Sequence, residues 1–488
     1  MRPSTTIAYA PGNRSSGDTQ QVDQSRATAQ AALSAGGIAA RLDRLPPTRA
    51  VWMMVVMLSL GYFFEIYDLM YTGYIAPGLI KSGVLSQTTH GIFGTTGVAS
   101  FIAALFSGLF IGTLVCGFLA DRFGRRAIFT YALLAYVAAN TVMAFQDDAL
   151  GLNIWRFIAG LGLGVELITI GTYISELVPK HIRGRAFATG QAIGFSAVPL
   201  VAFLSYLLVP QSFLGLDGWR WVVLLGAHGG ILVWWVRLRL PESPRWLAQK
   251  GRLEEADAIL RKLEAQVERE YGRPLPPPSE PDPVAPRTTF RDMWTKPFGK
   301  RTVMLVIFHV CQTIGYYGFA SWVPTLLIKQ GITVTHSLMY SSIIAIAAPV
   351  GPLLGLLIAD RFERKTVIVV MSLINIVCGL LFSQFRDTIF LVAMGVCLTL
   401  AGNIISFTYH AYQTELFPTS IRARAVGFVY SWSRLSAIFS AFIIADILKH
   451  FGTSGVFAFI AGAMTVVMLC IGIMGPRTRN VGLEQLSR

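Results

Sequence analysis

Two charged motifs occur twice in this chain. The first, GTLVCGFLADRFGRR at residues 112–126, returns as GPLLGLLIADRFERK at residues 351–365. The second, ELVPKHIRGR at residues 176–185, returns as ELFPTSIRAR at residues 415–424. Both are displaced by the same interval of 239 positions. A common interval for two independent motifs indicates a duplicated half, so the chain should fold into two similar halves.

Hydropathy places both halves in a membrane. Of 488 residues, 53% are hydrophobic and 14% are charged, and the mean hydropathy is +0.55. This is too apolar for a soluble protein of such length. Apolar runs of about 20 residues, the length of a helix that crosses a bilayer, recur over residues 51–475. They predict an all-α membrane protein with twelve transmembrane helices in two pseudo-symmetric six-helix bundles.

Polar segments divide the chain into five parts. Residues 1–46 contain no apolar stretch followed by a small-residue cleavage site, and we expect a disordered cytoplasmic tail. The two bundles cover residues 47–240 and 302–475. Between them, residues 241–301 are a cytoplasmic linker with an amphipathic helix, RLEEADAILRKLEAQVEREYG, and then a proline-rich segment. Residues 476–488 are a cytoplasmic C-terminal tail.

Basic residues concentrate in the loops on the same side as the N-terminal tail. This bias predicts that both termini lie in the cytoplasm, and it accounts for most of the net charge of +14. We expect the lipid bilayer as a partner, no nucleic acid, and a monomer. The five cysteines form no CxxC pair and no cluster has metal-ligand spacing, so we expect no metal and no organic cofactor.

The repeated loop carries a family resemblance. GxxxxGxxxDRxGRR at residues 112–126 resembles the signature loop of the major facilitator superfamily, and the second copy departs from it where Glu363 replaces a glycine. The resemblance extends over residues 51–475. It implies a transporter rather than an enzyme, with two six-helix bundles that rock around a central site between inward-open and outward-open states.

Two further segments narrow this resemblance. PESPRWL at residues 241–247 resembles a segment shared by sugar porters and by the organic-ion transporters, which include bacterial niacin permeases. Sugar porters usually carry a Gln-Gln pair in the seventh span, whereas this chain has Gln312 and then YYGFASWVP at residues 316–324. That pattern is more similar to the niacin permeases, which implies proton-coupled import of a small aromatic monocarboxylate, nicotinate first, across a bacterial inner membrane. The expected partners are then this small-molecule anion and protons. The alternatives are a symporter for sugars or benzoate-like acids, an organic-cation or drug antiporter, and a non-transporting sensor.

Charges present in both halves are expected to form a gate. Such charges can pair on one side of the protein in one state and separate in the other. The alternative is that they only set the topology of the loops. The gating candidates are Asp121, Arg122, Arg125, Glu176, Arg183, Asp360, Arg361, Glu415 and Arg422.

Ionisable residues that the duplication does not repeat need another explanation. A charge inside a bilayer costs at least about 2.5–3.5 kcal/mol on insertion scales, so each is a functional hypothesis. Asp68 and Arg156 fall in the outer thirds of the first and fourth spans and can pair there. Proton-coupled sugar porters have a similar pair, which implies that Asp68 accepts the proton. Glu65 and Glu166 are the alternative carriers, and a static ion pair is the other interpretation.

Arg434 lies near the middle of the eleventh span, with no obvious acidic partner nearby in that span. Organic-anion carriers of the family have an arginine on this span, and we expect Arg434 to bind the substrate carboxylate. The alternative is a salt bridge to Glu65 or Glu166 across the halves. Aromatic side chains at the same level favour a flat aromatic substrate over a polyol. The other substrate-site candidates are Tyr67, Tyr71, Gln191, Gln312, Tyr316, Tyr317, Asn403 and Trp432.

Overall fold

The fold was analysed in a computed structural model that describes residues 34–86, 94, 96–123, 125–238, 240–278, 290–296, 298–359, 361–417 and 419–478. The N-terminal half contains α3 (Arg49–Lys81), α4 (Val98–Phe123), α5 (Arg125–Met143), α6 (Ala149–Leu177), α7 (Arg183–Phe195), α8 (Ala197–Leu208) and α9 (Gly218–Arg237). The C-terminal half contains α12 (Phe298–Ala320), α13 (Val323–Lys329), α14 (Val334–Ala345), α15 (Ala347–Ala359), α16 (Arg364–Gln384), α17 (Thr388–Glu415) and α18 (Thr419–Met474). The smaller elements are α2 (Ala35–Asp43), β1 (Ser212–Phe213), β2 (Leu216–Asp217), α10 (Pro244–Gln249), α11 (Leu253–Tyr271) and the 3₁₀ helix η1 (Phe290–Trp294).

The helices provide the twelve apolar crossings that hydropathy predicts. Within the described residues, 10 helical spans are long and apolar enough to cross a bilayer, and one of them joins α7 to α8. The last span, Arg424–Met474, holds two crossings because α18 is broken at Gly452, whose φ is +65°. Only glycine adopts such a conformation readily. The shorter apolar helix Val98–Leu114 in α4 completes the set.

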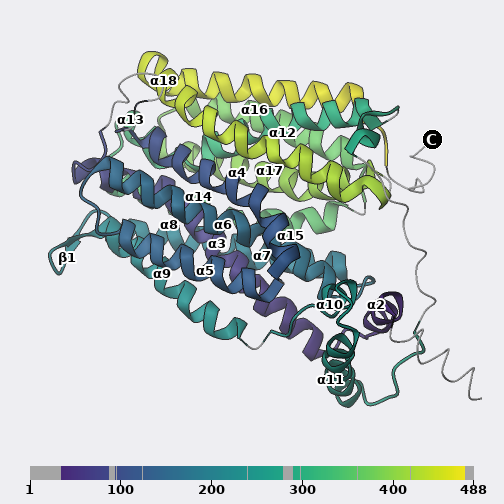
Figure 1. Cartoon of the computed structure of the whole chain (residues 1–488). Coiled ribbons are helices and arrows are strands. Elements are labelled where there is room, and N and C mark those ends of the chain that lie inside the picture. The colour runs from purple at the N-terminus through teal and green to yellow at the C-terminus, as the bar shows by residue number, and fades with distance from the viewer. Residues whose placement is uncertain are drawn as a thin grey trace, which may run out of the picture.

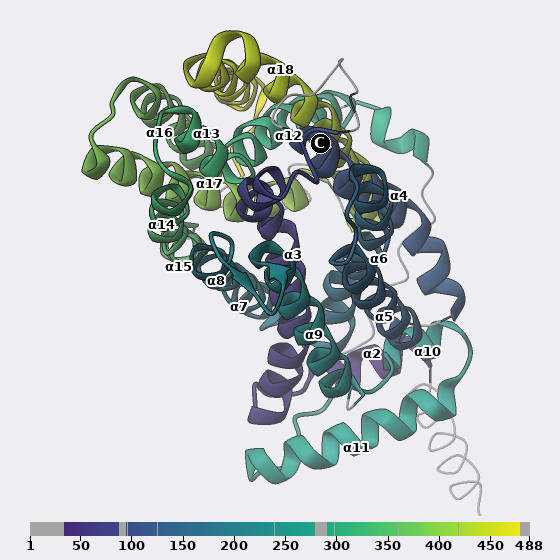
Figure 2. The same ribbon diagram turned by 90° about the vertical axis from the view of Figure 1, so that its left-hand side faces the viewer.

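The two halves lie next to each other with their helices roughly parallel (Figure 1). α2, α10 and α11 gather at one end of the molecule, which we call the linker end. The β1–β2 hairpin projects at the opposite end, which we call the hairpin end. Figure 2 shows α11 beside the N-terminal half and away from α16 to α18, and its packing partners include α2, α3 and α10.

The duplication is visible in hydrogen bonds as well as in motifs. Tyr173 donates its hydroxyl to the carbonyl oxygen of Pro241 at 2.6 Å, and Tyr412 donates to that of Pro476 at 2.8 Å. Tyr412 lies 239 positions after Tyr173, so the two bonds are equivalent. Each ties the fourth span of its half to the segment that follows the sixth. The pseudo-symmetry therefore extends to side-chain contacts.

A helix occupies part of the N-terminal segment that we predicted to be disordered. α2 covers Ala35–Asp43, so that prediction is wrong there, while residues 1–33 lie outside the described part of the chain. Arg41 on α2 forms salt bridges with Asp257 at 2.6 Å and with Glu264 at 2.7 Å, both on α11. These partners lie more than 200 positions away in the sequence, which is why no local pattern indicates them.

The Arg41 cluster should make the docking of α2 sensitive to acid. Burial acts to raise the pKa of Glu264, but hydrogen bonds from Arg41 and Arg44 outweigh it and lower that pKa. A carboxylate with a lowered pKa stabilises the fold above the unfolded-state pKa, and loses that contribution as the pH falls through the folded value. We therefore expect the protection of the α2 amides, taken relative to the intrinsic exchange rate at each pH, to fall below about pH 4, under the ordinary glutamate pKa.

Hydrogen exchange of α2 in the Arg41→Ala variant at pH 7 checks the same contact. Losing the charged hydrogen bonds of Arg41 should cost about 2 kcal/mol of local stability, so protection should fall. Arg261→Ala is the matched control, because Arg261 contacts Asp257 from its exposed side, with 73% of its own side chain accessible. Unchanged protection in Arg41→Ala would show that α2 is held by its apolar face alone.

The two halves touch at the hairpin end, where α3 packs against the break between α12 and α13. A Cβ atom added to Gly73 on α3 would overlap the backbone carbonyl of Ser321 in that break. Backbone cannot move aside as a flexible side chain can, so the approach depends on glycine. The halves are therefore closed against each other at this end.

Gly73→Leu should hold the halves apart at the hairpin end. In a chain whose native cysteines are replaced, Met70→Cys in the central cavity should then react about tenfold faster with an impermeant maleimide, as a shift of about 1.4 kcal/mol between states would give. The matched control is Gly462→Leu, because a Cβ atom at Gly462 meets nothing within 4 Å. Equal labelling rates in both backgrounds would contradict the role given to Gly73.

Candidate transport site

A polar network is enclosed within the N-terminal half. The Asp68 carboxylate accepts hydrogen bonds from Arg156 at 2.9 Å and from Asn140 at 2.9 Å. Tyr71 donates to the Asn140 side-chain oxygen at 2.8 Å, and Arg156 also contacts the hydroxyls of Tyr71 and Thr72. The side chains of Asp68 and Arg156 are both 0% exposed. The predicted pair is present, and its part in proton coupling stays a prediction.

This network offsets the cost of burying two charges. An ion in a protein interior loses several kcal/mol of hydration, which close pairing and further hydrogen bonds must replace. Arg156 also lies 4.5 Å from the ring centroid of Tyr71 and 5.1 Å from that of Phe101. Sequence reasoning missed Asn140. The available signal was an asparagine inside an apolar span, where a polar side chain needs a partner.

Arg434 is the buried charge of the C-terminal half. It lies on α18 and is 2% exposed. Its guanidinium donates to the hydroxyl of Tyr317 at 3.3 Å and to that of Tyr430 at 3.1 Å, and it lies 5.1 Å from the Tyr430 ring centroid. Both hydroxyls are neutral, so these contacts orient the positive charge without neutralising it.

Arg434 and Glu65 line the same small cavity from opposite halves. Glu65 lies on α3 and is 2% exposed, and the cavity wall also includes Gln312 and Tyr317. The two charges interact electrostatically. The cavity measures about 50 Å³, which is room for a few water molecules. This position suits either an anion anchor or a latch between the halves.

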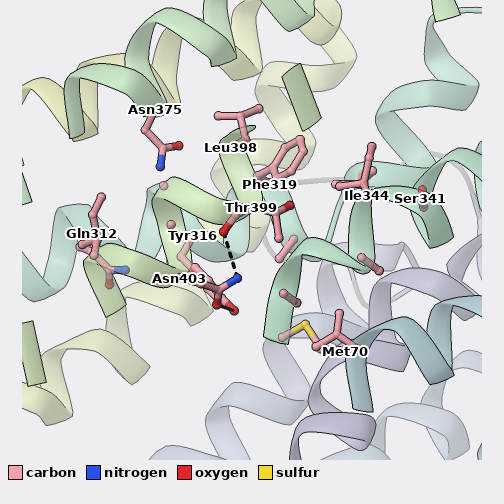
Figure 3. Close-up of a pocket in the computed structure, with 18 of the residues that line it drawn as sticks. Met70, Gln312, Tyr316, Phe319, Ser341, Ile344, Asn375, Leu398, Thr399 and Asn403 are labelled. Carbon is pink, nitrogen blue, oxygen red and sulfur yellow. Dashed lines mark hydrogen bonds between the residues drawn. The ribbon is translucent and has the colours of Figure 1, made fainter. Parts of the chain in front are cut away.

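A second cavity lies on the hairpin side of the first. Figure 3 shows side chains that line this second cavity. Met70, Gln312 and Tyr316 line both cavities, so the two form one continuous central site. Tyr316 donates to the side-chain oxygen of Asn403 at 3.3 Å, and Asn403 donates to the carbonyl of Thr399 at 2.9 Å. The central site thus brings together the predicted residues Gln312, Tyr316, Tyr317, Asn403 and Arg434.

Four predicted substrate contacts line neither cavity. Tyr67 is buried in the N-terminal half, where it donates to a backbone carbonyl of α9, and Tyr71 belongs to the Asp68 network. Trp432 is 36% exposed and packs on another aromatic ring of α18. Gln191 lies half-buried on α7. In this state Tyr67 and Tyr71 are engaged within the N-terminal half, and the part of all four residues in substrate binding stays a prediction.

Two histidines border the Arg434 cavity on its linker side. His309 contacts the side-chain oxygen of Gln413 at 2.9 Å. His410 lines the cavity and stacks on Tyr409 with ring centroids 4.2 Å apart. The sequence analysis found no cluster with metal-ligand spacing and gave these two histidines no role. Both lie inside apolar spans, but only the packing of α12 and α17 shows that they face this part of the protein.

Comparison with known proteins gives the family. The model of the sugar (and other) transporter family matches residues 53–488. The chain belongs to this family. The transporter is 32% identical to the putative metabolite transport protein YyaJ of Bacillus subtilis, over 90% of this chain and 95% of the relative. It is 28% identical to the niacin transporter NiaP of Acinetobacter baylyi, over 92% and 99%.

Solved structures agree on the fold. The xylose transporter XylE of E. coli, in a partially occluded inward-open conformation, superimposes with a TM-score of 0.71 at 19% identity, covering 88% of this chain and 99% of XylE. The transporter therefore has the major facilitator fold that the sequence resemblance implies. It is a multi-pass membrane transporter and not an enzyme.

One gating candidate of this transporter, Glu415, is paired at the linker end. Arg364 and Glu415 form a salt bridge of 2.9 Å. Their counterparts one interval earlier are Arg125 and Glu176. Outside the described side chains lie the gating candidates Asp121, Arg122, Arg125 and Asp360.

The repeated arginines after the fourth span of each half make equivalent contacts. Arg183 donates to the carbonyl of Val178 at 3.4 Å, and Arg422 donates to that of Phe417 at 3.2 Å. Arg361 is exposed. These bonds stay within one half of the transporter, so the gating role of the repeated charges stays a prediction.

Proposed function

We propose that this transporter imports a small aromatic monocarboxylate, nicotinate first, by proton-coupled alternating access. The observation that carries the proposal is Arg434, a buried guanidinium on the central site between the halves. A carboxylate can accept two parallel hydrogen bonds from a guanidinium. Tyr317 and Tyr430 stand beside Arg434, and their rings offer faces on which a flat aromatic ring can pack. The niacin transporter among the relatives supports the same substrate class.

In this proposal Asp68 is the residue that takes up and releases the coupled proton. It lies apart from the cavity that Arg434 lines. Arg156 neutralises Asp68 in the present state. A rearrangement of α3 against α6 that separates them would leave a buried carboxylate, which takes up a proton more readily than it keeps its charge. Glu65 in the cavity wall is the alternative carrier, and Glu166, buried on α6 near Tyr136, is another.

We place the linker end in the cytoplasm of a bacterial inner membrane, with the transporter acting as a monomer. Basic residues of the loops, such as Arg126 and Arg183, lie near α2 and α11 at that end, and cytoplasmic loops carry an excess of lysine and arginine. With the halves in contact at the hairpin end, the central site would then be closed to the periplasm.

Uptake of labelled nicotinate into proteoliposomes that contain only this transporter tests the proposal. An inward proton gradient should drive accumulation above equilibrium, and a protonophore should abolish it. Accumulation that is unchanged by the protonophore would remove the proton coupling. No nicotinate flux from demonstrably folded protein would remove the nicotinate assignment.

Sugar transport is the second candidate, because three amide side chains line the central site. Gln312, Asn375 and Asn403 could bind hydroxyl groups of a polyol. Competition decides between the candidates: excess xylose should leave nicotinate uptake unchanged if the site is built for an aromatic acid. Inhibition by xylose at concentrations where benzoate has no effect would favour the sugar.

A further inference from the structure

The cavity on the hairpin side of Arg434 has two different walls. The C-terminal half contributes amides from three helices, namely Gln312 on α12, Asn375 on α16 and Asn403 on α17. The N-terminal half contributes Met70, Tyr74 and Val198. Figure 3 shows Asn375 and Gln312 on the same side of the cavity as Tyr316, with Met70 opposite. A ligand in this space meets amides on one side and mainly apolar surface on the other.

Two of these amides have no hydrogen-bond partner among the described residues. Asn403 is held by Tyr316 and by the Thr399 carbonyl. Gln312 and Asn375 form no such bond with a described residue, although they are only 6% and 5% exposed. Buried polar groups are nearly always hydrogen-bonded, to protein, water or a ligand. Because both amides line the cavity, their partner has to come from inside it.

Two adjacent tyrosine rings connect Arg434 to the amide wall, which is formed by Gln312, Asn375 and Asn403. Tyr316 and Tyr317 are consecutive on α12, and their ring centroids lie 5.1 Å apart. Tyr317 accepts a hydrogen bond from Arg434, whereas Tyr316 bonds to the amide wall. Gln312 lines both parts of the site. A single-ring ligand anchored at Arg434 therefore presents its far end to the amides.

Gly402 keeps the space beside Asn375 open. A Cβ atom at Gly402 would lie 3.4 Å from the ring of Tyr316 and 3.9 Å from the Asn375 amide nitrogen. The missing side chain leaves a gap between these two groups, on α17 where it faces the cavity. That gap can receive a substituent of a bound ring.

We propose that Gln312 and Asn375 form a second polar subsite, which recognises a hydrogen-bonding group at the end of the substrate away from its carboxylate. The proposal rests on the proposed function, since it takes Arg434 as the anchor of the other end. A primary amide both donates and accepts hydrogen bonds. The substrate class is thereby narrowed to aromatic acids that carry a hydroxyl group or a ring nitrogen. Asn375 becomes a specificity-determining residue that sequence reasoning did not select.

Affinities of matched ligands test this subsite. The full-length transporter in nanodiscs is titrated calorimetrically with benzoate, 4-hydroxybenzoate and nicotinate. In the parent protein, the two ligands with a second polar group should bind about tenfold more tightly than benzoate, the worth of one hydrogen bond. Asn375→Leu and Gln312→Leu should remove this preference by weakening the polar ligands only.

Ser372→Ala is the matched control, because Ser372 lies one turn from Asn375 on α16 and bonds to the backbone carbonyl of Ile368. It should keep the preference of the parent. The same preference in Asn375→Leu as in the parent would overturn the subsite. The melting temperature of the ligand-free variant gives a second readout. An amide that bonds only to a ligand does not stabilise the ligand-free protein, so Asn375→Leu should melt no lower than the parent. A clear drop would show a structural amide and would also overturn the subsite.

The outcomes separate this proposal from the proposed function. If no aromatic acid binds the folded protein, the function assigned above fails, and the variants are titrated with xylose instead. Xylose affinity that falls in Asn375→Leu and persists in Ser372→Ala would sustain a polar subsite for another substrate. If Asn375→Leu changes the affinity of none of the ligands that bind, the proposed subsite is contradicted.

Discussion

Arg434→Ala should abolish nicotinate binding and transport. Removing one partner of a buried charged contact costs about 2–5 kcal/mol, so affinity should fall by about 30-fold or more. Arg434→Lys should restore part of it, because lysine keeps the charge and loses the two-pronged geometry. Binding is measured by calorimetry and flux in proteoliposomes. The control is Arg386→Ala in an exposed loop, which should behave like the parent.

The double variant Glu65→Gln with Arg434→Ala distinguishes an anchor from a latch. Glu65 and Arg434 line one cavity and interact electrostatically, so Arg434→Ala alone leaves a buried carboxylate without that compensation. If Arg434 served only to neutralise Glu65, the double variant would recover transport. We expect it to stay inactive, because the substrate carboxylate still lacks its cation. Recovery would assign the pair to the transport latch.

Asp68→Asn should remove proton-driven accumulation and leave exchange of nicotinate in place. Asparagine has the shape of aspartate but does not carry the exchangeable proton, so the accumulation ratio should fall to about one while counterflow continues. The measurement is uptake across a proton gradient, followed by counterflow at equal pH. Asp446→Asn at an exposed position is the control. Uphill transport by Asp68→Asn with the pH dependence of the parent would leave a static ion pair as the role of Asp68.

Stability has to be followed in the same variant. Asp68→Asn leaves Arg156 as a buried cation, and breaking a buried pair from one side costs about 3–5 kcal/mol. Asp68→Asn combined with Arg156→Gln removes both charges and should recover much of the melting temperature. It should still fail to accumulate nicotinate. If the double variant accumulates substrate, the carrier is Glu65 or Glu166.

Depth in the membrane was predictable from the sequence, and rotation about a helix axis was not. Counting residues along the first and fourth spans placed Asp68 and Arg156 at one level, and the structure pairs them at 2.9 Å. The same counting selected Tyr67 and Tyr71, which lie at suitable depth but contact α9 and Asn140. A helix turns by 100° per residue, and its neighbours decide which face meets the cavity.

Contacts between segments far apart in the chain were the other feature that the sequence could not predict. The disordered tail predicted for residues 1–46 contains α2, whose Arg41 binds α11. Like Asn140, Asn375 is an asparagine in an apolar span; this indicates that a partner is needed but not where that partner lies. Its significance comes from the cavity that α12, α16 and α17 form around it.

The sequence by itself determined the membrane class, the twelve crossings and the two equivalent halves. Bilayer thickness sets helix length, and an interval between motifs is a property of chain order alone. The tertiary structure decided which polar groups are satisfied within one half and which face the space between halves. Asp68 is enclosed by its partners, whereas Arg434 and the Gln312 and Asn375 amides line the central site. That difference depends on packing in three dimensions, because a hydrogen-bond partner is chosen by distance and not by position in the chain.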